Sequence, residues 1–206
     1  MAVRKRAAAI DPGSTRNSFA LAVVGENAAG LWVPLALREW IPRPGKPLDL
    51  RLDVLPEAAD VARSLGCDAW ASDSFASAET RIVSVEKGLR LVFVDSDAWE
   101  QWRHVFAAVN RGQLALAPTG RPGLPDATAL ERVRSQLGTV RRTPAARGTW
   151  SISLPEVEGA HGDLAMALAR ALWLARAGDP PAAAPPGPRP RGRSEYAPEM
   201  SPIRSL

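Results

Sequence analysis

The stretch AAAIDPGSTRNSFALAVVG, residues 7–25, decides the fold because it places two apolar segments on either side of a sharp turn. Pro12 disfavours the helical conformation for the residue before it, so the first segment is predicted to be a strand that ends at Asp11. A third apolar segment, LWVPLALREWI at 31–41, follows a second turn. The three segments together predict a β-meander, with the third strand at a sheet edge because Pro34 has no backbone N–H to donate.

The chain after the meander alternates helical and strand patterns. Residues 48–66 place apolar side chains at helical spacing, and Gly66 is well suited to end that helix. The segments DAWASD (68–73) and RLVFVDSD (90–97) are predicted strands with a helix between them, and this order predicts parallel pairing through a right-handed crossover. Further helices are predicted over 98–112, 126–138 and 161–177, and a two-stranded ribbon over 139–155.

These elements predict an α/β fold, with a mixed sheet of about five strands flanked by helices and an inserted helix plus β-ribbon. The first and fourth strands are expected to be neighbours at the sheet centre. The final helix is nearly apolar apart from Arg170 and Arg176, so it is expected to be buried against the sheet. Residues 1–177 are predicted to form one domain. Residues 178–206 hold eight of the nineteen prolines and are predicted to be a disordered Pro/Arg-rich tail.

Composition narrows the class of protein. The net charge is +4, of which the tail contributes +1 (four Arg against three acids), so the body is mildly basic. The single cysteine, Cys67, excludes an internal disulfide framework. The sequence contains no apolar run of membrane-spanning length and no signal-peptide core, since Asp11 interrupts the first apolar segment. We therefore expect a soluble cytoplasmic protein without a membrane partner.

Three acidic residues lie at the ends of apolar segments: Asp11, Asp73 and Asp163. Ends of strands and helices can direct side chains into one cleft, where clustered carboxylates repel one another unless a cation lies between them. Carboxylate oxygens suit Mg²⁺ or Mn²⁺, and a pair of such ions roughly 3.5–4 Å apart supports phosphodiester hydrolysis. The pattern therefore predicts a divalent-metal site.

Each acid also has a purely structural interpretation. Asp11 fits an Asx turn before Gly13, and Asp73 fits a cap on the helix that follows it. Asp163 in a first helical turn is stabilised by the helix dipole without any function. The three structural explanations would have to coincide at one end of one sheet, which favours the shared site.

Several segments, taken in order, resemble a known class of nucleases. AIDPGSTRNSFALAVV (9–24) is similar to the first hairpin of ribonuclease-H-like nucleases, especially RuvC-like Holliday-junction resolvases and the nuclease domains of phage terminase large subunits. HGDLAMALARALWLA (161–175) resembles the terminase ending, in which an Asp follows a His by two positions near the start of the last helix. RGQLALAP (111–118), the helix after it and the basic ribbon complete a similarity that covers about residues 6–177.

The resemblance implies a ribonuclease-H-like fold and a metal-dependent DNA endonuclease. It assigns Asp11, Asp73 and Asp163 as metal-binding catalytic acids, which would hold two Mg²⁺ or Mn²⁺ ions. His161 is a candidate auxiliary group near the metal or the scissile phosphate, and a loop histidine that only caps the helix is the alternative. RuvC-like resolvases usually have Glu as the second acid and two acids near the final helix, so Asp73 and the single Asp163 favour the terminase comparison.

The terminase comparison has a gap of its own. A complete large terminase carries an ATPase motor, and this sequence has no Walker-type GxxxxGK[ST] motif. The chain is then expected to be an excised or separately encoded nuclease domain, or a stand-alone relative. A packaging ATPase and a portal docked through the tail are the expected protein partners, in the cytoplasm of a bacterial host if the chain is phage-encoded.

A run of arginines predicts contact with double-stranded DNA. Such side chains beside an acidic cleft would offset repulsion between phosphates and carboxylates, and they would bind the backbone without reading sequence. The residues are Arg132, Arg134, Arg141, Arg142 and Arg147.

Three other functions stay open. A RuvC-like junction resolvase is the alternative within the nuclease class. IDPGST (10–15) also resembles the phosphate-binding turn of actin-like and sugar-kinase ATPases, but about 177 structured residues are too few for the two domains of those folds. The third is a non-catalytic DNA- or partner-binding module with a degenerate site.

Overall fold

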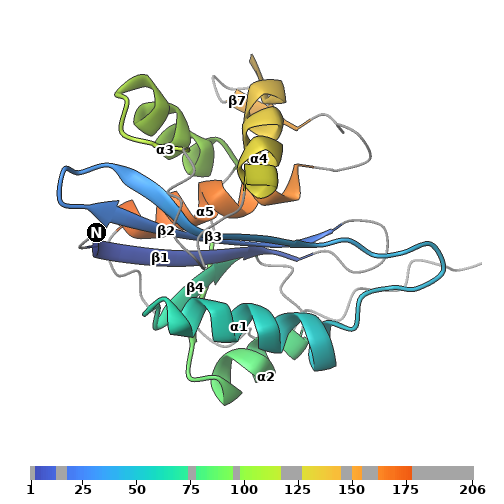
Figure 1. Cartoon of the computed structure of the whole chain (residues 1–206). Coiled ribbons are helices and arrows are strands. Elements are labelled where there is room, and N and C mark those ends of the chain that lie inside the picture. Colours follow the sequence, from blue (N-terminus) through green and yellow to red (C-terminus); the bar gives the residue numbers. More distant parts are fainter. Residues whose placement is uncertain are drawn as a thin grey trace, which may run out of the picture.

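A mixed five-stranded sheet forms the middle layer of the molecule, as predicted (Figure 1). The computed structural model describes residues 3–12, 18–73, 78–94, 98–116, 127–144, 150–154 and 162–177. The strands and helices within these ranges are β1 (Val3–Asp11), β2 (Phe19–Asn27), β3 (Trp32–Trp40), the π-helix η1 (Leu50–Val54), α1 (Leu55–Ser64), β4 (Ala69–Ser72), α2 (Ala78–Glu86), β5 (Arg90–Phe93), α3 (Ala98–Asn110), α4 (Ala127–Thr139), β6 (Arg141–Pro144), β7 (Trp150–Ser153) and α5 (Asp163–Ala177).

The strand order is β3-β2-β1-β4-β5, with β1 at the centre. The first three strands form an antiparallel meander, and β4 pairs in parallel with both β1 and β5. This confirms the predicted neighbours and the edge position of β3. Pro34 lies opposite Val24 at a shift in register, where its missing N–H costs no regular ladder bond.

The helical segment after the meander differs from the prediction of one continuous helix over 48–66. It begins with a π-helical turn, capped by Asp49, whose side chain accepts from the backbone N–H of Leu52 at 2.8 Å. The α-helix α1 starts only at Leu55. Pro56 has no N–H to bond the carbonyl of Leu52 and its ring crowds that carbonyl, so the preceding turn is widened. Gly66, with φ 78°, ends the segment as predicted.

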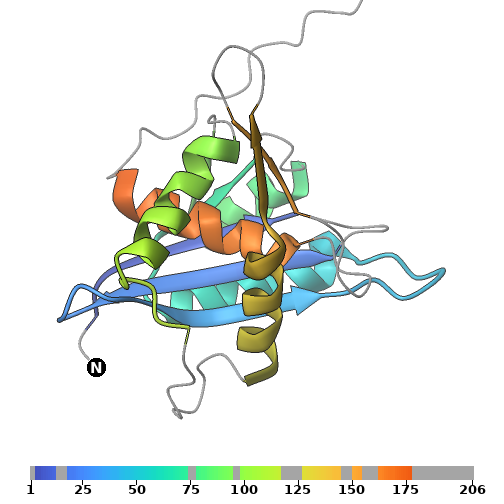
Figure 2. The ribbon, with the colours of Figure 1, turned by 90° about the horizontal axis from the view of Figure 1, so that it is seen from above.

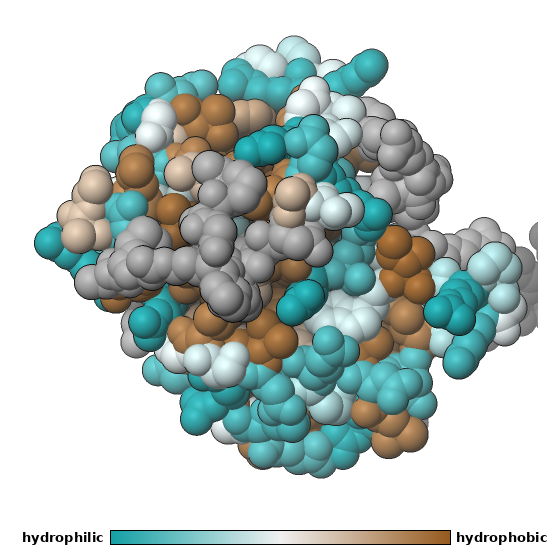
Figure 3. Space-filling view, viewed as in Figure 1, coloured by the Kyte–Doolittle hydropathy of each residue, from teal (hydrophilic) through white to brown (hydrophobic). Residues whose placement is uncertain are grey.

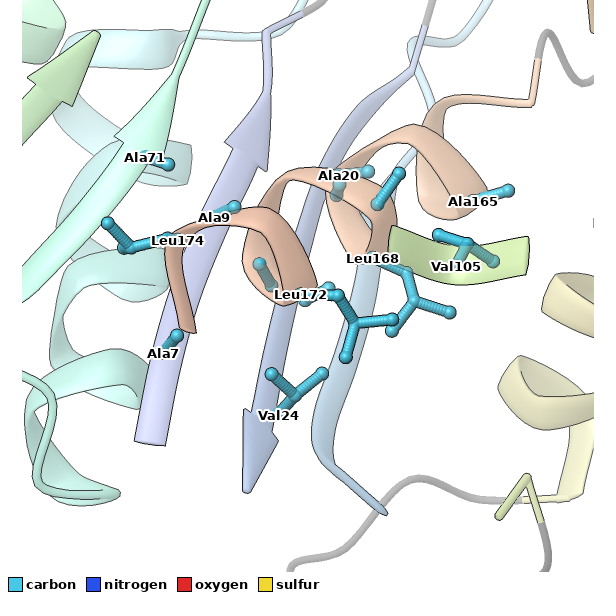
Figure 4. Close-up of a cluster of buried hydrophobic side chains, with 14 of the residues drawn as sticks. Ala7, Ala9, Ala20, Val24, Ala71, Val105, Ala165, Leu168, Leu172 and Leu174 are labelled. Carbon is cyan, nitrogen blue, oxygen red and sulfur yellow. The ribbon is translucent and has the colours of Figure 1, made fainter. Parts of the chain in front are cut away.

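The last helix, α5, is buried against one face of the sheet, mainly over β1 and β2 (Figures 1 and 2). The strands present alanines to it, among them Ala9, Ala20 and Ala71, and Leu168 and Leu172 of the helix pack among them (Figure 4). Small side chains on the strands let the helix lie close to the sheet. The first turn of α5 is therefore held near the end of the central strands.

The opposite face of the sheet is covered by α1 and α2 and has larger apolar side chains. Ile10, Phe19, Leu21 and Leu55 are all fully buried there. The part of the surface formed by α1 and α2 is mainly hydrophilic, with a few separate hydrophobic spots (Figure 3). Cys67 is buried and free, in keeping with a chain that does not depend on disulfides.

The predicted insertion is present on the α5 side. The strands β6 and β7 form a separate antiparallel ribbon, which lies with α3 and α4 over α5 (Figure 2). The residue predicted to begin α4, Asp126, and the predicted tail, 178–206, lie outside the described residues. In the described part of the chain, none of the helices is both long and apolar enough to cross a lipid bilayer.

Candidate acidic site

The three predicted acids lie at the same end of the sheet. Asp11 is the last residue of β1, Asp73 directly follows β4, and Asp163 is the first residue of α5. Ala9 pairs with Ala71 in the parallel β1–β4 ladder, and both face α5. Because side chains alternate along a strand, Asp11 and Asp73, two residues further on, also lie on the α5 face.

A buried arginine of α5 connects two of these acids. Arg170 Nη1 lies 2.5 Å from Asp11 Oδ1 and its Nη2 lies 3.1 Å from Asp73 Oδ2. The same Nη1 donates to the backbone carbonyl of Ile10 at 3.1 Å. The residue as a whole is only 6% exposed. The sequence showed this arginine as an exception in an apolar helix, and the structure places it between the acids of β1 and β4.

The third acid, Asp163, is held from the other side of the site. Ser18, directly before β2, has its Oγ 2.5 Å from Asp163 Oδ2 and 2.7 Å from Oε1 of Glu39. A hydroxyl carries one proton and donates to one acceptor at a time, so the two carboxylates share this serine. The other oxygen of Glu39 accepts from Arg132 Nη1 at 2.5 Å.

Glu39 is a fourth acid that the sequence interpretation missed. It pairs with Ala20 of β2, which pairs in turn with Asp11, so the three residues form one row across the meander. The strands β1 and β3 are both antiparallel to β2, so their carboxyl-terminal ends lie at the same end of the sheet. The sequence signal for Glu39 was its position two residues after Leu37: Leu37 faces α5, and side chains two apart on a strand lie on the same face.

The start of α5 is fixed by two further residues. Gly162 has φ 77°, and a side chain there would meet Leu154 at 2.7 Å, so the HGD motif needs glycine in the middle. Gln136 of α4 accepts from the backbone N–H of Ala165 at 2.9 Å, which satisfies one of the free amides of the first helical turn. Together they set the position of Asp163.

Electrostatics show that the acids are close enough to affect one another. The pKa of Asp11 is raised to about 6: burial is the largest cause, the negative charges of Asp163 and Asp73 also raise the pKa, and Arg170 partly offsets them. The site therefore favours bound positive charge, and Arg170 supplies one such charge.

The donor set has the chemistry that Mg²⁺ and Mn²⁺ prefer, because it consists of hard carboxylate oxygens. Its arrangement is that of an ion-pair network, since the guanidinium lies between Asp11 and Asp73. Among the residues that the structure describes, no group of three or more Asp, Glu, His or Cys side chains is placed to hold a metal ion. The acids converge as predicted, but their counter-charge in this conformation is Arg170.

A small hollow of about 190 Å³ lies beside this network. It is bounded by β3, the start of α4 and the start of α5, and both Glu39 and Arg132 line it. Its position gives solvent a route to the Glu39 side of the site.

The predicted DNA-binding arginines have different surroundings. Arg132 faces Glu39 and so belongs to the acidic site, and Arg134 pairs with Glu131 at 3.0 Å. Arg142 stacks on two indole rings, 3.5 Å from the ring centroid of Trp150 and 4.6 Å from that of Trp99. Other predicted residues are exposed or lie outside the described ranges: Arg141 is exposed, and Arg147 and His161 are outside.

Comparison with known proteins identifies the fold. No protein-family model matches the sequence, and no curated protein does. Similar solved structures include the large terminase of bacteriophage HK97 (TM-score 0.62, 15% identity), a mutant nuclease domain of the large terminase subunit of bacterial virus Sf6 with manganese and β-thujaplicinol (0.58, 15%), and the large terminase nuclease of thermophilic phage G20c with magnesium (0.59, 13%).

The extent of these matches differs. The similarity covers 84% of this chain for HK97 and for Sf6, and 82% for G20c. It spans 40% of the HK97 protein, against 89% of the Sf6 domain and 80% of the G20c domain. The match is therefore to a nuclease domain and not to a whole terminase. The chain has the ribonuclease-H-like fold of the nuclease domains of phage large terminases.

Proposed function

We propose that this chain is a divalent-metal-dependent endonuclease that hydrolyses phosphodiester bonds of double-stranded DNA. The observation that carries the proposal is the convergence of Asp11, Asp73 and Asp163 at one end of the sheet, within the fold of terminase nuclease domains. The manganese and magnesium in the Sf6 and G20c structures support Mg²⁺ or Mn²⁺ as the cofactor.

The acids would hold the metal, two ions in the full site. Asp11 and Asp73 are on neighbouring parallel strands and Asp163 faces them from α5. When bound, such ions act as Lewis acids that make water a better nucleophile and stabilise the leaving oxygen. The chain's own contribution is to hold the carboxylates in place, since Asp163 and Glu39 share the Ser18 hydroxyl and Arg132 pairs with Glu39.

Basic side chains near the insertion would bind the DNA. Arg141 and Arg142 are the first residues of β6. The β6–β7 ribbon lies over α5, the helix that begins with Asp163 (Figure 2). Arg147 and His161 are proposed to contribute a phosphate contact and an auxiliary group, and Arg134 a further phosphate contact. Binding through such contacts is expected to weaken as salt rises.

We place this activity in phage DNA packaging, in the cytoplasm of the bacterial host. A packaging ATPase is the proposed partner because the HK97 match is to a large terminase of which this chain spans 40%. Residues 178–206 are proposed to dock on the portal. Co-purification with and without this segment tests that contact.

The test of the nuclease is cleavage of supercoiled plasmid with Mn²⁺ or Mg²⁺. Asp11→Asn and Asp163→Asn are each expected to reduce cleavage to the level seen with a metal chelator. Asp53→Asn is the matched control, because Asp53 is an exposed acid of η1 on the other face of the sheet. Cleavage by a folded Asp11→Asn protein at the wild-type rate would contradict the proposal.

One observation favours a second candidate, a non-catalytic DNA- or partner-binding module. Arg170 already pairs with both Asp11 and Asp73, as expected of a structural ion-pair network. Salt-dependent DNA binding without cleavage, and no change of thermal stability on adding Mn²⁺, would support that candidate.

A further inference from the structure

Arg170 is an unusual residue for its position. Among the described residues it is the one buried Lys or Arg, and the helix around it consists mostly of Leu and Ala. Burial of a guanidinium is costly unless it is paired and hydrogen-bonded. A leucine would fill the same apolar stripe without that cost, so the charge itself needs an explanation.

The contacts of Arg170 point to the acids. Its two terminal nitrogens each bind a different strand-end carboxylate, Asp11 and Asp73, and one of them also binds the carbonyl of Ile10. Its Nε, also buried, finds no hydrogen-bond partner among the described residues. The interaction is therefore directed at the two carboxylates and leaves part of the guanidinium unsatisfied.

The direction of approach matters for what else can bind. The Arg170 side chain is 8% exposed, whereas those of Asp11 and Asp73 are 17% and 24% exposed. The guanidinium reaches the acids from the protein interior, and the acids keep some access to solvent. A cation arriving from solvent would meet the same carboxylates from the other side.

We propose that Arg170 is a resident counter-cation of the Asp11–Asp73 pair, which a divalent ion must displace in order to bind. The two compete because a metal ion would bind the two carboxylates that Arg170 already holds, and the two positive charges would repel each other. Arg170 thereby sets the metal concentration at which the site fills and keeps the acids together before it does. This inference rests on the proposed metal-dependent function and adds a positioning residue to it.

The test is a titration of thermal stability with Mn²⁺, because a ligand that binds the folded state raises its melting temperature. Arg170→Gln removes the charge and retains polar groups. It is expected to lower the melting temperature without metal and to lower the Mn²⁺ concentration of half-maximal stabilisation by about tenfold or more, within the usual range of coupling between two ligands. Arg170→Lys keeps the charge but lacks the planar fork that places one nitrogen on each carboxylate, so an intermediate shift is expected.

The matched control is Arg176→Gln. Arg176 is on the same helix and loses the same charge, but its guanidinium contacts Gln113 Oε1 at 3.3 Å and no acid of the site. Its metal response is expected to equal that of the wild type. An equal shift in both glutamine variants would mean that only net charge matters, and would overturn the proposal.

A measurement on the unaltered chain keeps the proposal testable if the Arg170 variants do not fold. Titration with diamagnetic Mg²⁺ is expected to shift the NMR signal of the Arg170 Nε–H group, assigned through bonds, in parallel with metal binding. An unchanged signal at metal saturation would show that the guanidinium stays in place, and would overturn it.

The outcomes separate this inference from the proposed function. Wild-type protein that is stabilised by Mn²⁺, with Arg170→Gln responding at the same concentration, would refute displacement and leave the metal-dependent function intact. If Mn²⁺ stabilised Arg170→Gln but not the wild type, this would support the displacement of Arg170 by the metal, with Arg170 preventing metal binding in the wild type. Absence of a response in every folded variant would refute the metal-dependent function itself.

Discussion

The two faces of the sheet differ in chemistry, although each strand contributes side chains to both faces. Ile10 and Asp11 are consecutive in β1, yet Ile10 belongs to the fully apolar cluster under α1 and Asp11 to the polar row under α5. The α1 face has large apolar side chains. On the α5 face the strands carry alanines, and the carboxylates, a serine and an arginine lie at the end of these strands. The difference indicates a division of labour: the α1 face provides stability and the α5 face provides the site.

The largest expected effect comes from damaging the α1 face. Leu55→Ala removes a fully buried side chain and is expected to reduce the free energy of unfolding by roughly 2–5 kcal/mol, measured by urea denaturation. Leu52→Ala, in the same helical segment but 75% exposed, is the control and is expected to change it by less than about 0.5 kcal/mol. If the Leu55 variant folds, its Mn²⁺ midpoint should match that of the wild type. A shifted midpoint would show that the two faces are not independent.

The second prediction concerns the pH dependence of the α5 face. Burial and the neighbouring acids raise the pKa of Asp11 from 3.8 to about 6, so the folded state holds this proton more tightly than the unfolded chain does. The contribution of Asp11 to stability is therefore highest below pH 3.8 and is lost as pH rises towards 6. The full change is on the order of 3 kcal/mol.

Asp11→Asn tests whether stability is lost as pH rises. The stability of the variant relative to wild type is expected to rise between about pH 4 and 6 and then to level off, when the free energy of unfolding is measured across this range without metal. A stability difference that does not vary with pH would show that Asp11 has an ordinary pKa, and would remove the electrostatic contrast between the faces.

The smallest expected effect distinguishes two arginines of α4. Arg132 pairs with Glu39, whose side chain is 5% exposed, whereas Arg134 pairs with Glu131, whose side chain is 73% exposed. Arg132→Gln leaves a buried carboxylate with a weaker partner, at a cost of about 1 kcal/mol, the low end for such groups because Arg132 itself reaches solvent. Arg134→Gln should cost less, as surface ion pairs usually do. Equal unfolding free energies for the two variants would argue against a role of Glu39 in the polar row.

Much of the architecture was predictable from local patterns. Pro34 indicated the edge strand, Gly66 ended the first long helix, and the β-α-β order implied the parallel pairing of β4 and β5. The exception was the start of the helix at residue 50, where the effect of Pro56 on the preceding turn gave a π-helix. Local backbone chemistry explains both the successes and that error.

The site was predictable only in part. Asp11, Asp73 and Asp163 each stand at the end of an apolar segment, which a reader of the sequence can recognise. Glu39 and Arg170 have no such mark, since one follows an ordinary strand pattern and the other is a single charge in an apolar helix. Their roles depend on which distant groups lie opposite them.

The sequence by itself determined the helices and strands, their order and the positions of the acids at their ends. The spacing of apolar residues, proline and glycine each affect backbone conformation over only a few residues, so a linear pattern contains them. Tertiary structure decided the chemistry of the site. Packing of α5 on the strand alanines brought Arg170 between Asp11 and Asp73, and the meander placed Glu39 in the row of Asp11. Pairing of charges depends on distance through space, which a linear pattern does not contain.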